Sequence, residues 1–174
     1  MKNSSKIVLQ GIAIGLFASW VKSLAEPPLQ EIGEKYFPPT SEELDLKGAD
    51  VNGQPENMPP AVLSKQVYHC YTDKNLSKKD TLKSMKYIHY GLGAFIGIVY
   101  AKIFSRQKKS FPLQGLATGS AVWLATHGST VPELGLQGKV KDMPKSWWVW
   151  EYGSHLVFGV ALEKSYKLIK KIIK

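Results

Sequence analysis

Residues 147–162 read WWVWEYGSHLVFGVAL, and this stretch decides the predicted fold. Within its apolar part, Glu151 and His155 lie four residues apart and therefore share one face of a helix. The stretch opens with three tryptophans of the kind that form an aromatic belt at a membrane–water interface: Trp147, Trp148 and Trp150. Because ionisable side chains are costly inside a membrane, the Glu151–His155 pair indicates a functional site in a membrane-spanning helix.

Three more segments are apolar enough to cross a bilayer, which takes a helix of about 20 residues at about 1.5 Å each. The four expected spans are 7–26, 85–104, 113–131 and 147–166. The sequence therefore predicts an all-α, single membrane domain over residues 1–174, an integral membrane four-helix bundle with up-down-up-down topology. Small residues that allow close helix approach recur in these spans: Gly11, Gly15, Gly93, Gly97, Gly115, Gly119 and Gly159.

The first span has a second interpretation, as a secretory signal peptide. Basic residues precede its apolar run, and Ser23-Leu24-Ala25 resembles a cleavage site. Trp20 and Lys22, however, are poor residues for the end of a signal peptide's apolar region. We therefore expect the first helix to be retained.

Residues 27–83 are expected to form a polar external loop that begins where Pro27 and Pro28 end the first span. Two capping signals predict helix starts within it, at Thr40 with Glu43 and at Ser77 with Asp80. Apolar residues also recur at helical spacing and predict a short amphipathic helix on the bundle or the interface: Leu63, Val67, Cys70 and Tyr71.

The formal net charge of +9 bears on partners and on topology. Lysine and arginine residues flank apolar segments instead of forming one stripe, which argues against nucleic acid as a partner. The N-terminus, the 105–112 loop and the 167–174 tail are basic, whereas residues 27–60 are acidic. By the positive-inside rule both termini are expected to be cytoplasmic, although lysines near the start of the second span weaken this argument.

Every expected span carries ionisable side chains at a similar depth, in the outer third of the bilayer when counted at about 1.5 Å per residue. The expected buried polar site comprises Lys22, Glu26, His89, His127, Glu151 and His155. A single histidine is more often a hydrogen-bonded core residue, so the hypothesis depends on convergence from four helices. A structural hydrogen-bond network explains the same residues without a function.

Two kinds of chemistry fit this set of residues. Imidazole and carboxylate are ligands of zinc and iron, which makes His89, His127, Glu151 and His155 candidate ligands of a divalent metal. The paired Glu-x-x-His of di-iron bundles is absent, and Lys22 would oppose a cation. A chain of histidine and glutamate equally suits a proton relay or an ion path, because histidine titrates near neutral pH. No motif of a soluble enzyme class assigns catalytic residues, so enzyme activity stays open.

Several pieces of the chain, in their order and spacing, resemble the YagU family of bacterial inner-membrane proteins of unknown function. The pieces are KSLAEPPL at 22–29, Pro59-Pro60, His89, the stretch from Gly115 through His127, and WVWEYGSHLV at 148–157. The resemblance implies a multi-pass protein of the bacterial cytoplasmic membrane with an uncleaved first helix. It supplies no established catalytic residue.

Three classes of function therefore remain open. The first is a proton- or ion-linked transport or stress protein, and the second is a metal-binding membrane protein or metal-dependent membrane enzyme. The third is a structural or accessory subunit whose partner supplies the activity. Expected partners are the lipid bilayer and either further copies of the chain or another membrane protein, because four short spans are few for a monomeric transporter.

Overall fold

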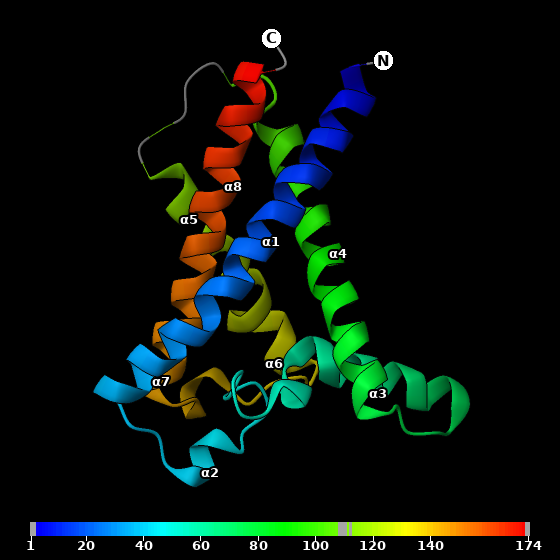
Figure 1. Cartoon of the computed structure of the whole chain (residues 1–174), viewed down its shortest axis with the longest axis vertical. Coiled ribbons are helices and arrows are strands. Elements are labelled where there is room, and N and C mark those ends of the chain that lie inside the picture. Colours follow the sequence, from blue (N-terminus) through cyan, green and yellow to red (C-terminus); the bar gives the residue numbers. More distant parts are fainter. Residues whose placement is uncertain (1–2, 108–110, 112, 173–174) are drawn as a thin grey trace.

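The computed structural model describes residues 3–107, 111 and 113–172, and all regular structure in these ranges is helical. Figure 1 shows α1 (Asn3–Tyr36) between α4 (Lys78–Phe104) and α8 (Gly153–Ile172). α1 packs along both of these helices, and α8 also packs along α5 (Gln114–Ala125). The prediction of an all-α fold is confirmed. The beginning of α1 and the end of α8 lie at the same end of the molecule in Figure 1.

Among the described residues, two helices are long and apolar enough to cross a membrane, namely Ser4–Tyr36 of α1 and Lys78–Phe104 of α4. Only 33% and 22% of their most apolar windows are buried inside the molecule, whereas a core helix of a water-soluble protein is mostly buried. Length and composition thus mark two of the four expected spans as candidate membrane helices. Within the described part of the chain, α5 and α8 do not meet the same test.

Pro27 and Pro28 do not end the first helix, so the expected boundary of the 7–26 span is wrong. Both prolines lie inside α1, which continues to Tyr36. A proline within a helix removes a backbone donor and crowds the preceding turn. The helix can continue past this point only if contacts with other parts of the chain offset that cost.

Gln30 makes such contacts from the second half of α1. Its buried side chain accepts hydrogen bonds at Oε1 from the backbone N–H groups of Val51 and Asn52, at 3.0 and 3.1 Å. Its Nε2 donates to Asp50 Oδ1 at 2.8 Å and to Glu34 Oε1 at 2.5 Å. One polar side chain therefore ties the loop around residue 50 to α1.

The segment expected as a polar loop at 27–83 is largely helical. After α1 it contains α2 (Ser41–Leu44), the short 3-10 helix η1 (Pro55–Asn57) and α3 (Pro59–Thr72), and α4 begins at Lys78. The predicted capping box at α2 is confirmed, because Thr40 Oγ1 accepts from the Glu43 N–H at 3.2 Å and Glu43 Oε2 accepts from the Thr40 N–H at 2.8 Å. The predicted start of α4 is also confirmed by the Ser77 hydroxyl, which accepts from the Asp80 N–H at 3.1 Å.

The helix predicted after Pro60 exists as α3, but most of its expected apolar stripe does not pack on the bundle, and the interfacial position stays a prediction. Ala61 and Val62 are buried, whereas Val67, Cys70 and Tyr71 of the expected apolar stripe are exposed. The reason is that only the first turns of α3 lie against the rest of the chain. The apolar residues of its second half have no core to enter.

The third and fourth expected spans are each interrupted by a π-helical turn. The 113–131 segment consists of α5, the π turn η2 (Thr126–Thr130) and the beginning of α6 (Val131–Glu133). After the 3-10 turn η3 (Val140–Asp142), the chain passes through α7 (Lys145–Trp147) and the π turn η4 (Trp148–Tyr152) into α8. The basic tail expected at 167–174 is helical through Ile172, and its last two residues lie outside the described residues.

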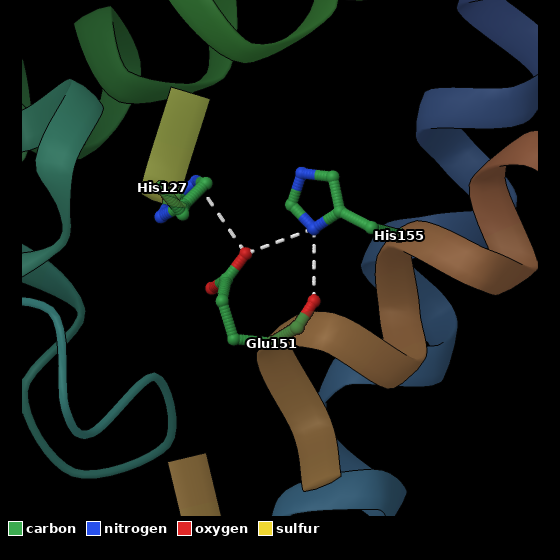
Figure 2. A group of neighbouring side chains, drawn as sticks. All are labelled: His127, Glu151 and His155. Carbon is green, nitrogen blue, oxygen red and sulfur yellow. Dashed lines mark hydrogen bonds and ion pairs between the residues drawn. The ribbon is translucent and has the colours of Figure 1, made fainter. Parts of the chain in front are cut away.

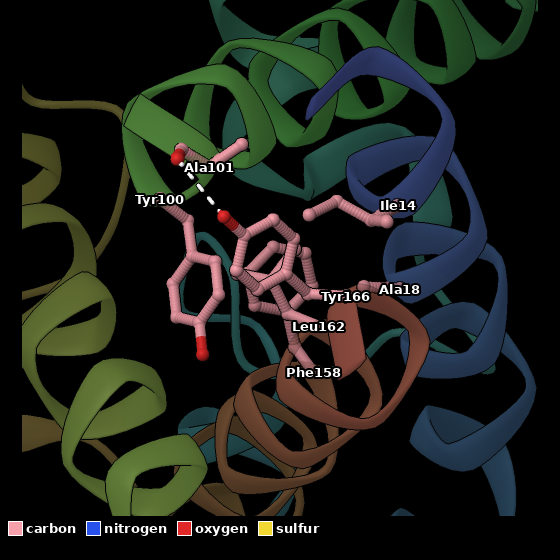
Figure 3. Packing of buried hydrophobic residues seen from close by; sticks show 7 residues of the cluster. All are labelled: Ile14, Ala18, Tyr100, Ala101, Phe158, Leu162 and Tyr166. Atoms are coloured by element: carbon pink, nitrogen blue, oxygen red, sulfur yellow. Dashed lines mark hydrogen bonds between the residues drawn. The ribbon is translucent and has the colours of Figure 1, made fainter. Parts of the chain in front are cut away.

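Two apolar cores hold the helices together. One, shown in Figure 3, joins α1, α4 and α8 near the chain ends, where the Tyr166 hydroxyl donates to the Ala101 carbonyl at 3.3 Å. The other lies at the opposite end and contains Trp123, Trp147 and Trp150. Trp147 and Trp150 are fully buried and only Trp148 is exposed, so the predicted interfacial belt is wrong for two of its three tryptophans. They pack against the loop segments that cover that end, including Ala49 and Met58.

Candidate functional site

Close helix packing brings the elements of the candidate site together. A Cβ atom built on Gly15 would collide with the backbone of Gly93, and one built on Gly159 would collide with the backbone of Gly115. All the glycines expected at helix contacts show such collisions: Gly11, Gly15, Gly93, Gly97, Gly115, Gly119 and Gly159. Glycine therefore permits the close approach of α1 to α4 and of α5 to α8.

Lys22 carries a charge into the interior of the chain. It lies on α1, its side chain is 8% exposed, and it forms an ion pair with Glu26 one helical turn later. Its Nζ also lies 3.6 Å from Glu151 Oε1, and the Glu151 side chain is only 1% exposed. A buried lysine thus links a carboxylate of its own helix to one carried by η4.

The Glu151 carboxylate is the centre of the cluster. Besides Lys22, its Oε1 faces His127 Nε2 at 3.4 Å and His155 Nδ1 at 3.1 Å. Figure 2 shows the two imidazole rings on either side of this carboxylate. Among the described residues, however, this buried oxygen accepts no hydrogen bond of good geometry. Lys22 Nζ, His127 Nε2 and His155 Nδ1 therefore lie around Glu151 Oε1, but none of them donates a hydrogen bond of good geometry to it.

The hydrogen bonds of the two histidines explain this arrangement. His155 Nδ1 lies 2.8 Å from the backbone carbonyl of Glu151, so its Nδ1–H donates there instead of to the carboxylate. His127 Nδ1 lies 2.6 Å from Gln137 Oε1, which is an acceptor only. The Gln137 amide is oriented because its Nε2 donates to the carbonyls of His127 and Gly138, both at 3.4 Å.

This tautomer leaves two lone pairs facing each other. When neutral His127 carries its proton on Nδ1, its Nε2 is an acceptor and points at the Glu151 oxygen from 3.4 Å. Two acceptors at this distance repel unless a proton or a cation lies between them. The site is therefore organised to receive one positive charge between His127 and Glu151.

A cavity of about 320 Å³ lies beside this cluster. Its lining includes most of the residues predicted for the polar site: Lys22, Glu26, His89, His127 and Glu151. His155 lines a second cavity of about 70 Å³, which shares Lys22, His89 and His127 with the first. All six residues expected in the buried polar site thus line one or both of two neighbouring cavities.

His89 takes a different position from the one expected for a metal ligand. Its Nε2 lies 3.3 Å from the backbone carbonyl of Ser19, so it links α4 to α1. In the described part of the chain, the group whose atoms lie close enough to hold one metal ion comprises His127, Glu151 and His155. The expected four-residue ligand set is corrected to these three.

Two contributors to the site were not predicted. Gln137 orients His127 from the loop between α6 and η3, and Ser19 receives His89 through its backbone carbonyl. Gln137 is 5% exposed, which is unusual for a loop glutamine, but burial is not readable from its neighbours in sequence. The Ser19 contact could not be predicted either, because it uses a backbone carbonyl, which every residue type has.

Comparisons of the chain with protein-family models, with curated proteins and with solved structures found no match.

Proposed function

We propose that the chain is a four-helix, multi-pass membrane protein whose polar cluster binds one exchangeable proton in an ion-linked role. The observation that carries the proposal is the buried Glu151 oxygen, which faces three nitrogens and accepts a hydrogen bond from none of them.

Support for the membrane comes from the exposed apolar surface of α1 and α4. Large apolar side chains project from both helices into the surroundings, among them Phe17, Leu24, Phe95 and Ile103. In a bilayer these side chains contact acyl chains, so their exposure carries no cost. In this proposal α5 with η2, and α7 with η4 and α8, complete the four crossings.

The direction of insertion follows from charge. Both described chain ends and the end of α4 carry lysine or arginine and lie at one end of the molecule (Figure 1). This end faces the cytoplasm, and the end that holds Glu151 and the acidic segment 27–60 faces outward. A bacterial inner membrane and membership of a YagU-like family follow from the sequence resemblance and belong to the same proposal.

Support for a proton comes from the charges in the cluster. Lys22 contributes one positive charge, whereas Glu26 and Glu151 contribute two negative charges, and all three side chains are at most 13% exposed. Lys86 also lines the cavity, but it is exposed and therefore screened by solvent. The buried cluster thus lacks one positive charge, and a buried uncompensated charge is costly. A proton on His127 Nε2 would form a hydrogen bond to Glu151 Oε1. It would supply the missing positive charge and remove the repulsion between the two acceptor atoms.

The arrangement also suits transfer of that proton. Carboxylate, ammonium, carboxylate and imidazole follow one another from Glu26 through Lys22 and Glu151 to His127. Such chains of ionisable groups are typical of proton paths in pumps and transporters. Because the cluster lies near one end of the helices, a further copy of the chain is expected to complete a path across the bilayer.

A metal-binding role is the second candidate, favoured by the group His127, Glu151 and His155. The bond from His127 Nδ1 to Gln137 leaves Nε2 as a ligand, in the manner of outer contacts that orient metal-binding histidines. Zinc or iron would suit these donors. Two features oppose it, namely the nearby Lys22 ammonium and the use of His155 Nδ1 in a backbone hydrogen bond.

Proton flux in proteoliposomes tests the proposal. Purified protein is reconstituted around a pH-sensitive dye, and flux is recorded after an imposed membrane potential, with and without metal ions. The wild type should conduct protons, and Glu151→Gln should abolish the flux while it preserves side-chain shape. Glu163→Gln is the matched control, because Glu163 is a buried glutamate of α8 that accepts from the Gly115 N–H, away from the cluster.

Two results separate the candidates. Equal flux in the wild type and Glu151→Gln would refute the proton-linked role. Stoichiometric zinc or iron in the purified protein, lost in His127→Ala and Glu151→Gln, would establish the metal-binding role in its place. A folded protein with neither property would leave the structural or accessory role as the one that fits.

A further inference from the structure

Another cavity, distinct from the two beside the polar cluster, lies at the opposite end of the molecule from Glu151. It has a volume of about 880 Å³ and is lined by residues of α1, of α8 and of α4 with the segment after it, near the chain ends. Four basic residues line it: Lys6, Lys102, Arg106 and Lys170. Its walls also include apolar side chains from α1 and α4, among them Ile7, Val8, Ile98 and Ile103.

The charge at this cavity is entirely of one sign. Among the described residues that line it, none is acidic. Lys102 and Arg106 are exposed and form no ion pair within the described ranges. Lys170 is held in place, because its Nζ donates to the Gln107 carbonyl at 3.2 Å and lies 5.2 Å from the centre of the Tyr166 ring. Basic groups of α1, of the end of α4 and of α8 therefore converge at a cavity whose described lining contains no acidic side chain.

The apolar walls continue along the surfaces that α1 and α4 expose. Val8 is 38% exposed and Ile103 is 65% exposed, and both lie at the rim of the cavity. A ligand that fits must therefore be anionic at one end and apolar along its length. This combination describes a phospholipid with a net negative headgroup, and it does not describe a soluble anion.

We propose that the cavity between α1, α4 and α8 binds an anionic phospholipid, with its phosphate among Lys6, Lys102, Arg106 and Lys170 and its acyl chains along the apolar walls. The inference rests on the proposed membrane location and goes beyond the proposed proton role. Basic cavities between transmembrane helices on the cytoplasmic side are suited to such headgroups. The lipid would contact three helices at this end of the molecule.

Native mass spectrometry of the full chain in detergent tests this site. Phosphatidylglycerol, phosphatidylcholine with the same acyl chains, and inorganic phosphate are added separately, and bound adducts are counted. We expect phosphatidylglycerol to be retained at least about tenfold more tightly than phosphatidylcholine. The double variant Lys102→Gln/Arg106→Gln should lose about tenfold in phosphatidylglycerol affinity. Both replaced side chains are exposed, so folding should persist.

The matched control removes two charges elsewhere. Lys139 and Lys141 are exposed lysines beside η3, at the end that holds Glu151, and Lys139→Gln/Lys141→Gln should bind phosphatidylglycerol like the wild type. Equal retention of the two lipids, or equal losses in the two double variants, would overturn the lipid site. Binding of inorganic phosphate as tight as that of the lipid would assign the cavity to a soluble anion.

Membrane location is tested in the same preparation. If cell fractionation finds the protein in the aqueous phase without detergent, both the membrane proposal and the lipid site fail. If the protein is in the membrane and the two lipids bind equally, only the lipid site fails.

Discussion

The ammonium of Lys22 lies 3.6 Å from the carboxylate of Glu151, and this contact joins the first long helix to the turn that precedes the last one. Both side chains are almost fully buried. Glu26 holds the lysine from the other side, so two carboxylates share one buried cation. The contact therefore stabilises the fold and at the same time leaves the cluster short of one positive charge.

Removal of Lys22 should destabilise the protein strongly. Lys22→Met would leave two buried carboxylates without a cation, and loss of one partner of a buried pair costs about 3–5 kcal/mol. Thermal unfolding in detergent measures the effect. Lys167→Met is the matched control, because Lys167 forms the same kind of pair with Glu163 but is 42% exposed, so its loss should cost about 1 kcal/mol or less. The double variant Lys22→Met/Glu151→Gln should recover part of the loss, and no recovery would contradict a direct coupling.

Glycine contacts between helices should be intolerant of large side chains. Gly93→Leu and Gly119→Leu would drive a side chain into Ser19 and into the backbone of His155, respectively. We expect each to lower the unfolding free energy by about 1–3 kcal/mol or more, from overpacking. Gly91→Leu is the control, since a Cβ there meets no atom within 4 Å. If all three variants unfold at the same temperature, the helices do not pack as described.

The orientation of His127 should depend on Gln137. In the wild type, nitrogen NMR of labelled histidine should show that the neutral form of His127 carries its proton on Nδ1, because Gln137 Oε1 accepts from that atom at 2.6 Å. Gln137→Leu removes the acceptor and should redistribute the proton between the two ring nitrogens. An unchanged tautomer in this variant would show that another group orients the ring.

The loop around residue 50 should depend on Gln30. Gln30→Leu removes the acceptor for the Val51 and Asn52 N–H groups and the donor to Asp50. Trypsin should then cleave faster at the exposed Lys47, by about tenfold if the lost bonds contribute about 1.4 kcal/mol to loop closure. Gln66→Leu, at an exposed position of α3, should leave the cleavage rate unchanged.

Much of the arrangement was predictable because it follows from local patterns. Apolar runs predicted the helices α1 and α4, glycine spacing predicted which faces approach closely, and counting residues along the spans placed the ionisable groups at one depth. The contact between Lys22 and Glu151 was predictable because the two residues were expected at a similar depth along their helices. None of these predictions required knowledge of the loops.

The departures come from contacts between distant parts of the chain. α1 continues past Pro27 because Gln30 binds the loop at residues 50–52, and no local pattern reports that contact. Trp147 and Trp150 are buried because the loop segments fold over them, although the same residues would suit a membrane interface. Gln137 could not be assigned to the site, because its role depends on a loop conformation.

Proton counting tests the central claim most directly. Metal-free protein in detergent is titrated from pH 8 to pH 5, and the protons bound per chain are counted for the wild type, Glu151→Gln and the control Glu163→Gln. The account predicts that the wild type and the control bind one more proton than Glu151→Gln, because only that variant removes the charge that recruits a proton to His127. Equal counts for the wild type and Glu151→Gln would contradict it.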